Sequence, residues 1–183
     1  MNYPRSFRHR EQLPFTPNSL WKIESGYART MTWNAEGAIA ALGIWGTGDV
    51  IGHCLSNIEP YQIECLGPVV AREVAISNNC TRLLLSHIQQ IEQLLNLANI
   101  QQASARLIGL LEWLAQRFGR LESHGYLIDI PLTHQSIAEL IGTTRVTVTR
   151  TLSELERAGK IQRLRQHRIL LQSCERSDLA MRK

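Results

Sequence analysis

Short apolar runs separated by turn residues fill the chain from Leu20 to Ile76. In order, the runs read LWKIESG, YARTMTW, AIAALGIWG, TGDVIG, YQIECLG and PVVAREVAI. Glycines recur between them at roughly the 8 to 12 residue spacing of antiparallel sandwiches and small barrels. The segment NAEG separates two runs and ends in Gly37, so we expect a hairpin turn with a positive φ at that glycine. The pattern predicts an all-β N-terminal domain.

The apolar period changes after Asn78, where apolar residues recur at alternating steps of four and three. This spacing is typical of the seam of a two-stranded coiled coil. The seam positions are Leu84, Ile88, Ile91, Leu95 and Ala98. The solvent side is expected to hold Gln89, Gln90, Glu92 and Gln93. The spacing therefore predicts a long helix that pairs with its copy.

A second apolar flank on the same helix leaves another packing arrangement open. Leu83, Leu94 and Leu97 lie beside the seam, so the helix can also pack against its own β domain. Both contacts can occur together, with the flank on the β domain and the seam on a partner subunit.

Two further elements are predicted before residue 134. Apolar residues from Ala103 to Phe118 follow helical spacing, and Gly119 supplies a stop at the C′ position. The segment HGYLIDIPLT then predicts a short strand that leads to Thr133 at a helix N-cap position.

Two short helical patterns flank Gly142 in the stretch LTHQSIAELIGTTRVTVTRTLSELERAGKI, residues 132–161. The second helix starts after Thr143 or Thr144, either of which can cap it, and stops at Gly159. The residues expected in the core are Ile137, Leu140, Ile141, Val148, Leu152 and Leu155. This arrangement is typical of a helix-turn-helix, whose second helix enters the DNA major groove.

The second of these helices begins RVTVTR, with four β-branched residues in a row. Such residues cost a few tenths of a kcal/mol each in helix propensity, so tertiary packing must hold the helix in place. The face opposite the core is expected to present Arg145, Val146, Thr149 and Arg150. Arginine can donate two hydrogen bonds to guanine, and valine can pack on a thymine methyl group. Threonine hydroxyls can bind phosphates, and the threonines expected to do so near the start of this helix are Thr143, Thr144 and Thr147.

The segment KIQRLRQHRILLQ after Gly159 alternates apolar residues around an RQHR turn, which predicts a β-hairpin or wing. Its basic residues are Lys160, Arg163, Arg165, His167 and Arg168. Directly after a helix-turn-helix, we expect them along the DNA backbone, with Arg165 and Arg168 on phosphates. The alternative is an edge hairpin made basic for solubility, since charges protect strand edges.

The composition is that of an ordinary globular protein, with 183 residues of which 44% are hydrophobic and 20% charged. No run approaches the roughly 18 apolar residues of a membrane helix. The N-terminus lacks the apolar stretch of a signal peptide, so we expect a cytoplasmic protein with no membrane partner. Residues 1–100 hold 7 Lys and Arg against 8 Asp and Glu, whereas residues 101–183 hold 13 against 8. A basic C-terminal half favours contact with a polyanion, with a solvated basic surface as the alternative.

Four cysteines, Cys54, Cys65, Cys80 and Cys174, form no C-x-x-C pair. Neither a zinc ribbon nor a secreted disulfide scaffold is therefore indicated. Most are expected to be buried thiols, and we expect no bound metal or cofactor. A redox-responsive or metal-responsive regulator that uses Cys54 and Cys65, beside His53, is the alternative.

The order of β domain, pairing helix and winged helix-turn-helix resembles the CRP/FNR superfamily of dimeric bacterial transcription regulators. The stretches LWKIESGYART, WGTGDVIG and LTHQSIAELIGTTRVTVTRTLSELERAGKI carry the resemblance, which extends from Leu20 to Leu171. The recognition helix is most similar to that of the branch of the nitrogen-control regulator NtcA. The resemblance implies an α+β fold with three parts. They are an antiparallel, cupin-like jelly-roll β-roll over 1–76, shortened at its N-terminus, a dimerisation helix over 77–100 and a winged helix-turn-helix over 101–183.

The resemblance also implies a function and partners. The chain is expected to be a sequence-specific DNA-binding regulator, not an enzyme, that acts as a homodimer on a pseudo-palindromic site in double-stranded DNA and contacts RNA polymerase. Arg145, Val146 and Arg150 are implied to read bases, with Thr147 and Gln135 on phosphates. Val146 stands where the cyclic-AMP receptor branch has glutamate. The resemblance therefore implies a different, G-T-A-like half-site, because valine cannot accept a hydrogen bond from cytosine.

The ligand-binding end departs from the cyclic-nucleotide members of the family. Those members have a glutamate after a glycine and an arginine several residues later, whereas Gly52 is followed here by His53 and the arginine region reads IEPYQIE. A cyclic phosphate would lose its main charge partner, so cyclic AMP is not expected as the effector. The iron–sulfur pattern of FNR is absent too, because no cysteine precedes Cys54. The expectation is an unidentified small-molecule effector, or none.

Two other classes of function compete with this interpretation. A cupin-like enzyme would use His53, His87 or Cys54, but the sequence has no two-His-one-carboxylate spacing, no nucleophile elbow and no phosphate-binding loop. A protein-interaction module would use the winged domain as a binding surface without DNA. The array of arginines and threonines on the second helix argues against that class, because an interface core does not ordinarily need it.

Overall fold

The computed structural model describes residues 3–76 and 81–172. The chain divides into two compact units, which are Met1–Ile100 with Glu139–Gly142, and Gln101–Ala138 with Thr143–Lys183. No helix within the described ranges is long and apolar enough to cross a membrane.

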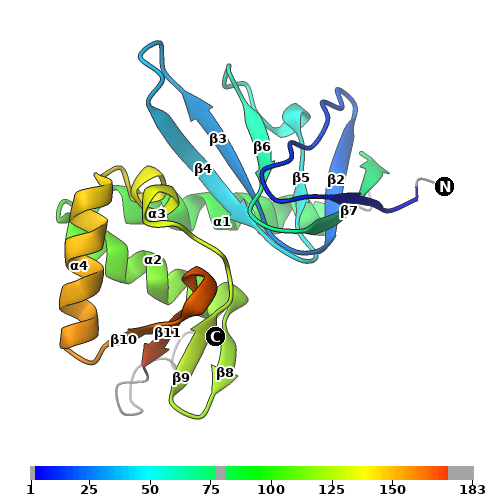
Figure 1. The fold of residues 1–183 in the computed structure, drawn as a ribbon. Coiled ribbons are helices and arrows are strands. Elements are labelled where there is room, and N and C mark those ends of the chain that lie inside the picture. The colour runs from blue at the N-terminus through cyan, green and yellow to red at the C-terminus, as the bar shows by residue number, and fades with distance from the viewer. Residues whose placement is uncertain (1–2, 77–80, 173–183) are drawn as a thin grey trace. The chain divides into compact units, whose positions relative to one another are not determined.

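The first unit is built on two antiparallel sheets that share one apolar core (Figure 1). One sheet has the strand order β1-β7-β2-β5 and the other has the order β4-β3-β6. The strands are β1 (Arg5–Phe7), β2 (Ser19–Ser25), β3 (Ala28–Trp33), β4 (Ile39–Trp45), β5 (Val50–Ile51), β6 (Gln62–Cys65) and β7 (Val69–Ala75). The predicted antiparallel β-roll is confirmed.

The core of this unit is filled from both sheets. Trp21 and Ile23 of β2 and Ile63 of β6 are fully buried in it. Phe7 of β1 meets Trp21 edge to face, with ring centroids 5.5 Å apart, an arrangement that aromatic pairs prefer. Strand β1 pairs with β7 and was not predicted, because RSF is a three-residue run among charges with no apolar alternation.

The NAEG segment forms the predicted turn between β3 and β4. Gly37 has a φ of 79°. The Asn34 Oδ1 atom accepts hydrogen bonds from the backbone N–H groups of Glu36 (3.1 Å) and Ala38 (2.9 Å). Asparagine commonly stabilises turns by this kind of bond to the backbone a few residues on. The predicted hairpin is confirmed.

Helix α1 (Thr81–Ala98) packs on β4 and β5 through polar side chains. The His87 ring stacks on Trp45, with centroids 4.1 Å apart. Gln90 donates a hydrogen bond from its amide to the carbonyl oxygen of Ile44. The prediction that Gln90 lies on the solvent side is therefore wrong. It shares the inner face with His87 three residues earlier, and its hydrogen bond offsets the cost of burying an amide.

The expected start of this helix at Asn78 lies outside the described residues. So do Cys80 and Cys174, two of the four cysteines of which most were expected to be buried thiols.

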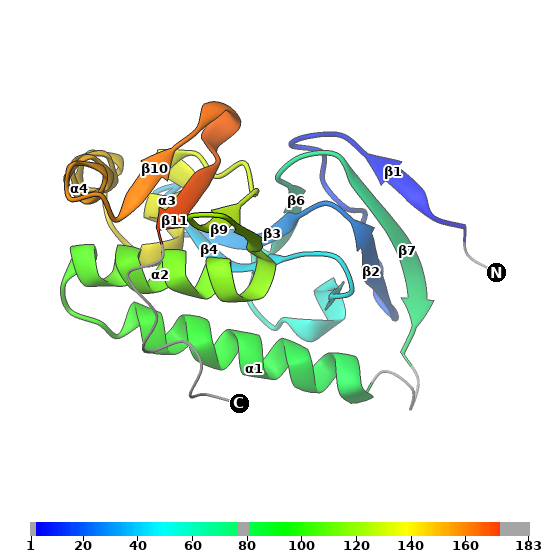
Figure 2. The ribbon, with the colours of Figure 1, turned by 90° about the horizontal axis from the view of Figure 1, so that it is seen from below.

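The second unit combines three helices with one antiparallel sheet of order β10-β11-β9-β8 (Figure 2). The helices are α2 (Ala103–Phe118), α3 (His134–Ile141) and α4 (Arg145–Arg157). The strands are β8 (Arg120–Glu122), β9 (Gly125–Ile128), β10 (Ile161–Arg163) and β11 (Ile169–Gln172). The buried leucines of α2 pack against α4, β9 and β11. The predicted helix-turn-helix and wing are confirmed, whereas β8 was not predicted because its three residues are all exposed.

Helix α2 ends at Phe118 as predicted, but the following glycine has a different role. Gly119 has φ −71° and ψ 144°, an extended conformation rather than the left-handed one expected at C′. A Cβ atom added at Gly119 would lie 2.2 Å from the carbonyl oxygen of Ala115. The position therefore requires glycine for a close backbone approach.

Gly26, in the turn between β2 and β3, combines two constraints that give a test of the β-roll. Its φ is +86°, and an added Cβ would lie 2.2 Å from the carbonyl oxygen of Pro68. Gly48 has a φ of +94° but open space around an added Cβ. Gly26→Ala should therefore lower the free energy of unfolding by the cost of positive φ, of order 1–3 kcal/mol, plus about 1–3 kcal/mol for overpacking.

Gly48→Ala is the matched control, because it should show only the cost of positive φ. Chemical denaturation of the full chain, followed by tryptophan fluorescence, measures both variants. Equal losses of stability in the two variants would contradict the close approach at Pro68.

Candidate nucleic-acid interface

Hydrogen-bonded caps and one glycine set the turn between α3 and α4. The Thr133 Oγ1 atom accepts the backbone N–H of Ser136 at 3.0 Å, which caps α3. Gly142 turns the chain with a φ of 61°. Thr144 rather than Thr143 is the N-cap of α4, since its Oγ1 accepts the backbone N–H of Thr147 at 3.2 Å. These bonds satisfy helix N–H groups that have no partner within the helix.

The inner face of α4 anchors it in the second unit. Val148, Leu152 and Leu155 are buried as predicted, and α4 contacts α2. Thr151 is buried as well, which the sequence pattern did not indicate. Burial of this face explains how a helix that starts with β-branched residues is held, because packing outweighs their small loss in propensity.

The outer face of α4 gathers the four residues that were predicted to read bases. Arg145, Thr149 and Arg150 are exposed, and the side chain of Val146 is 77% exposed. Neither arginine forms an ion pair within residues 3–76 and 81–172. The helix therefore presents two guanidinium groups whose donors are available to an external acceptor.

The hydroxyl of Thr149 is engaged within the protein. Its Oγ1 donates to the carbonyl oxygen of Arg145 at 2.9 Å, and the Nδ1 atom of His134 lies 2.8 Å from the same oxygen. Because the Thr149 hydroxyl is engaged in these bonds, the methyl group is the part of the side chain that is best suited to contact a base. Sequence reasoning missed His134, because a histidine at the start of a helix carries no pattern of its own.

The residues predicted to contact phosphates surround this face. Gln135 is exposed in the first turn of α3, and Thr144 is exposed at the start of α4. Thr143 and Thr147 are half-buried. The hydroxyl groups of Thr144 and Thr147 lie 2.9 Å apart, so one can donate to the other while the second donates outward.

The basic residues of the wing differ in whether they have a carboxylate partner. Arg165 is exposed in the turn between β10 and β11. Arg168 is half-buried, with its Nε 3.9 Å from an Asp129 carboxylate oxygen. The Nε of Arg163 donates to Glu156 at 2.7 Å, and these hydrogen bonds hold the pKa of the Glu156 carboxyl below its ordinary value. Arg163, expected along the DNA backbone, is thus exposed but paired with Glu156.

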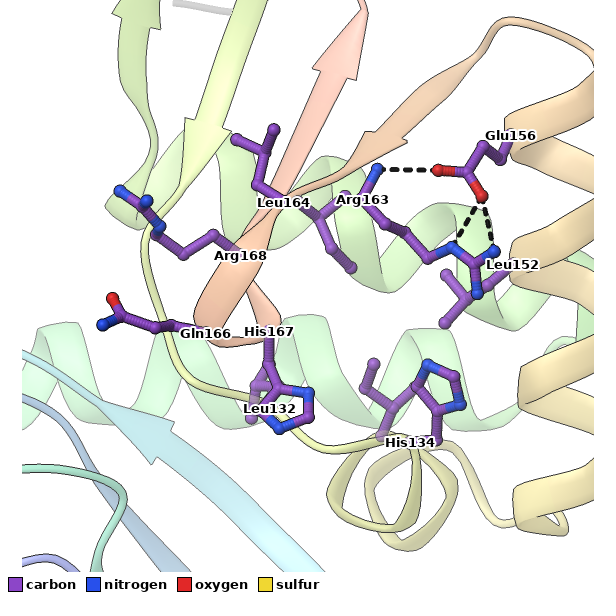
Figure 3. A pocket seen from close by; sticks show the side chains of 11 residues that line it. Leu132, His134, Leu152, Glu156, Arg163, Leu164, Gln166, His167 and Arg168 are labelled. Atoms are coloured by element: carbon purple, nitrogen blue, oxygen red, sulfur yellow. Dashed lines mark hydrogen bonds and ion pairs between the residues drawn. The ribbon is translucent and has the colours of Figure 1, made fainter.

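A pocket of about 470 Å³ opens between α3, α4 and the wing (Figure 3). Its polar lining consists of His134, Glu156, Arg163, Gln166, His167 and Arg168. Burial lowers the pKa of the His134 imidazole, and the positive charges of Arg163, His167 and Arg145 lower it further. The lining is mainly cationic, so it suits an anion better than a neutral ligand.

The predicted dimer seam lies on the outer side of α1. Ile88, Ile91 and Leu95 are 53%, 42% and 62% exposed, and Ala98 is exposed too. Leu84 is half-buried. The predicted inner flank of Leu83, Leu94 and Leu97 is half-buried as well. The structure thus brings the seam residues together as one apolar strip that the described chain leaves uncovered.

A smaller pocket, of about 320 Å³, lies in the first unit. It is lined by Phe15, His53, Ser56, Ile58, Glu59 and Tyr61. The His53 ring lies edge-on to the rings of Phe15 and Tyr61. Burial lowers the pKa of His53, partly opposed by the charge of Glu59, and burial raises the pKa of Tyr61 to about 12. No arginine or lysine lines this pocket among the described residues, so an anionic phosphate would have no cation to pair with there.

The two cysteines in the described part of the chain, Cys54 and Cys65, differ in their exposure. Cys65 is fully buried, as most of the cysteines were expected to be, whereas Cys54 is exposed. Burial raises the pKa of both thiols, that of Cys65 to about 12. Protonated thiols are poor nucleophiles and metal ligands, which disfavours the redox-responsive and metal-responsive alternative. Within residues 3–76 and 81–172, no three His, Cys, Asp or Glu residues are grouped to hold a metal.

Comparison with known proteins agrees with this geometry. The family model described as a Crp-like helix-turn-helix domain matches residues 105–176. The regulatory protein CysR of Synechococcus elongatus is 44% identical over 160 residues, which cover 84% of this chain and 77% of that protein. The global nitrogen regulator of the same organism is 36% identical over 107 residues, which cover 58% of this chain and 48% of that protein.

The fold has relatives of known structure. FixK2 from Bradyrhizobium japonicum superposes with a TM-score of 0.79 at 18% sequence identity, over 94% of this chain and 93% of that one. At this identity the likeness shows the fold alone, whereas the match to CysR shows the family. The chain therefore belongs to the CRP/FNR superfamily, and it is a DNA-binding transcription regulator and not an enzyme.

Proposed function

We propose that the chain acts as a homodimer that binds a pseudo-palindromic DNA site, with α4 of each copy in the major groove. The observation that carries this proposal is the outer face of α4, where Arg145 and Arg150 are exposed beside Val146 and have no carboxylate partner among the described residues. Two such helices would read half-sites about 34–36 Å apart, one helical turn of DNA.

The roles of the α4 residues follow from their chemistry. Arg145 and Arg150 each donate to guanine O6 and N7, and Val146 packs on a thymine methyl group. Thr149 contributes its methyl group, because its hydroxyl is bonded to the Arg145 carbonyl oxygen. The resulting half-site is G-T-A-like. It differs from a half-site in which a cytosine donates to a glutamate, because Val146 cannot accept that hydrogen bond.

Phosphate contacts fix the helix on the duplex without reading sequence. We assign them to Gln135, Thr143, Thr144, Thr147, Arg165 and Arg168. Arg165 is the strongest candidate, since it is exposed in the wing turn and forms no ion pair within the described residues. Arg168 must loosen its long contact with Asp129 in order to reach a phosphate.

The dimer forms through α1. An apolar strip with three large side chains that are 42% to 62% exposed is costly in water, and its steps of four and three suit pairing with an identical helix. In this proposal residues 77–100 form the dimerisation helix between the β-roll (1–76) and the DNA-binding domain (101–183). The regulator acts in the cytoplasm, where bacterial DNA is found, and contacts RNA polymerase.

The effector, if the protein has one, is not a cyclic nucleotide. The pocket of the first unit offers aromatic rings and a glutamate and has no arginine or lysine in its described lining. A thermal-shift screen of small metabolites identifies an effector by stabilisation of the folded chain.

Selection of bound duplexes from a random pool is the direct test of the DNA proposal. The recovered half-site and spacing report on the α4 roles and on the dimer together. A set of recovered sequences with no shared half-site would overturn sequence-specific binding.

The recognition arginines and the wing arginine should respond differently to removal. Arg145→Ala or Arg150→Ala should cost about 1–3 kcal/mol on the selected site and relax the preference at one base pair, whereas Arg165→Ala should weaken all duplexes alike. Fluorescence anisotropy with selected and random duplexes at one fixed salt concentration measures both effects. Equal losses on the two duplexes for all three variants would contradict the assigned roles.

The α1 strip should control assembly. Ile88→Glu with Ile91→Glu should yield monomers with weakened operator binding, because buried carboxylates in the seam would repel one another across the dimer. Gln89→Glu, on the adjacent exposed side of the helix, is the matched control and should leave the dimer intact. Sedimentation velocity measures the state of each variant. An unchanged dimer in the double variant would refute the seam.

A further inference from the structure

His134 connects the two helices of the DNA-binding motif. It is the first residue of α3, and its Nδ1 lies 2.8 Å from the Oγ1 atom of Thr149 in the first turns of α4. That hydroxyl also donates to the Arg145 carbonyl oxygen at 2.9 Å. A chain of two hydrogen bonds therefore runs from the imidazole to the backbone of the residue that carries the first recognition guanidinium.

The direction of these bonds fixes the tautomer of the ring. A threonine hydroxyl has one proton, and in this geometry the proton goes to the Arg145 carbonyl oxygen. The Thr149 oxygen must then accept from His134, so the neutral ring carries its proton on Nδ1. Nε2 holds the lone pair, and a second proton can bind there without breaking the bond to Thr149.

The charged groups around the ring are mostly cationic. Arg145 and Glu156 belong to α4, Arg163 to β10, and His167 and Arg168 to the wing turn and its end. Glu156, Arg163, His167 and Arg168 line the same pocket as His134, and Arg168 points away from the ring (Figure 3). Glu156 and Arg163 form an ion pair, so their charges partly compensate each other. Burial lowers the pKa of His134 in the free protein, and the positive charges of Arg163, His167 and Arg145 lower it further.

DNA would reverse this balance. The Gln135 side chain next in sequence is assigned to a phosphate, so that phosphate would lie close to the ring, and the cationic pocket lining would attract the DNA backbone to the same place. Their negative charge favours an imidazolium, which can donate from Nε2. We propose, on the basis of the DNA-binding roles given above, that His134 takes up a proton when the protein binds DNA. Operator binding therefore becomes weaker as the pH rises and this proton is no longer available.

The direction of the pH dependence follows from the linkage between protonation of His134 and DNA binding. His134 has a lower pKa in the free protein than in the DNA complex. A proton is therefore taken up on DNA binding when the pH lies between these two pKa values. The added affinity is full below the free-protein pKa and is lost as the pH rises through the pKa of the complex. One proton corresponds to at most about a tenfold change in Kd per pH unit.

The test compares two histidine variants on the selected operator between about pH 6 and pH 8, where histidine titrates, at fixed ionic strength. His134→Asn places an amide N–H where Nδ1 donates to Thr149 but cannot titrate. It should flatten the change of Kd with pH and leave the affinity near the weak, high-pH value of the wild type. His124→Asn is the matched control, since His124 is exposed in the turn between β8 and β9 and is not among the residues assigned to DNA, and it should keep the wild-type slope.

A second measurement needs no variant. Nuclear magnetic resonance of the imidazole protons of the wild-type chain gives the pKa of His134 with and without operator duplex, and that pKa should rise on binding. An unchanged or lowered pKa, or a His134→Asn variant with the wild-type slope, would overturn the proton linkage. Failure of the wild type to prefer the operator over random duplex at any pH would instead overturn the proposed function on which it rests.

Discussion

The burial of one face of α4 is the constraint on which the rest of the molecule depends. Val148 and Leu152 are almost completely buried, and their contact with the α2 side of the unit fixes both the position and the rotation of the helix. Since packing holds α4, its outer face need not contribute to stability. That face can therefore carry β-branched residues and two arginines without carboxylate partners in the described chain, which a helix stabilised by its own surface would not favour.

Helix α1 has polar residues on its inner face and large apolar residues on its outer face, which is the reverse of α4. Its inner face is anchored on the β-roll by a histidine stacked on Trp45 and by a buried glutamine amide. Its large apolar residues Ile88 and Leu95 point away from that contact. The cost of burying these side chains is reduced because the His87 Nδ1 atom and the Gln90 amide N–H group meet carbonyl oxygens of strands β5 and β4. The apolar seam is then left for a second copy of the chain, and one arrangement serves both the roll and the proposed dimer.

Much of the fold was predictable from the sequence because its periodicities are local. The hairpin turn at Gly37, the cap and turn of the helix-turn-helix and the wing after Gly159 all depend on residues within a few positions of one another. Strands β1 and β8 were not predictable, because three-residue segments carry no period and exist through pairing with β7 and β9. The exposure of Cys54 and the burial of Gln90 likewise depend on which distant strand lies opposite each residue.

The sequence by itself determined which residues share a face of each helix, because side-chain positions repeat every 3.6 residues. From this came the outer face of α4 and the seam of α1. Only the tertiary structure decided what each side chain meets. It paired Arg163 with Glu156, joined His134 to Thr149 and left Arg145 without an ion pair in the part of the chain that the structure describes. These outcomes join residues from different elements, and such distances are set by packing of the whole unit rather than by local spacing.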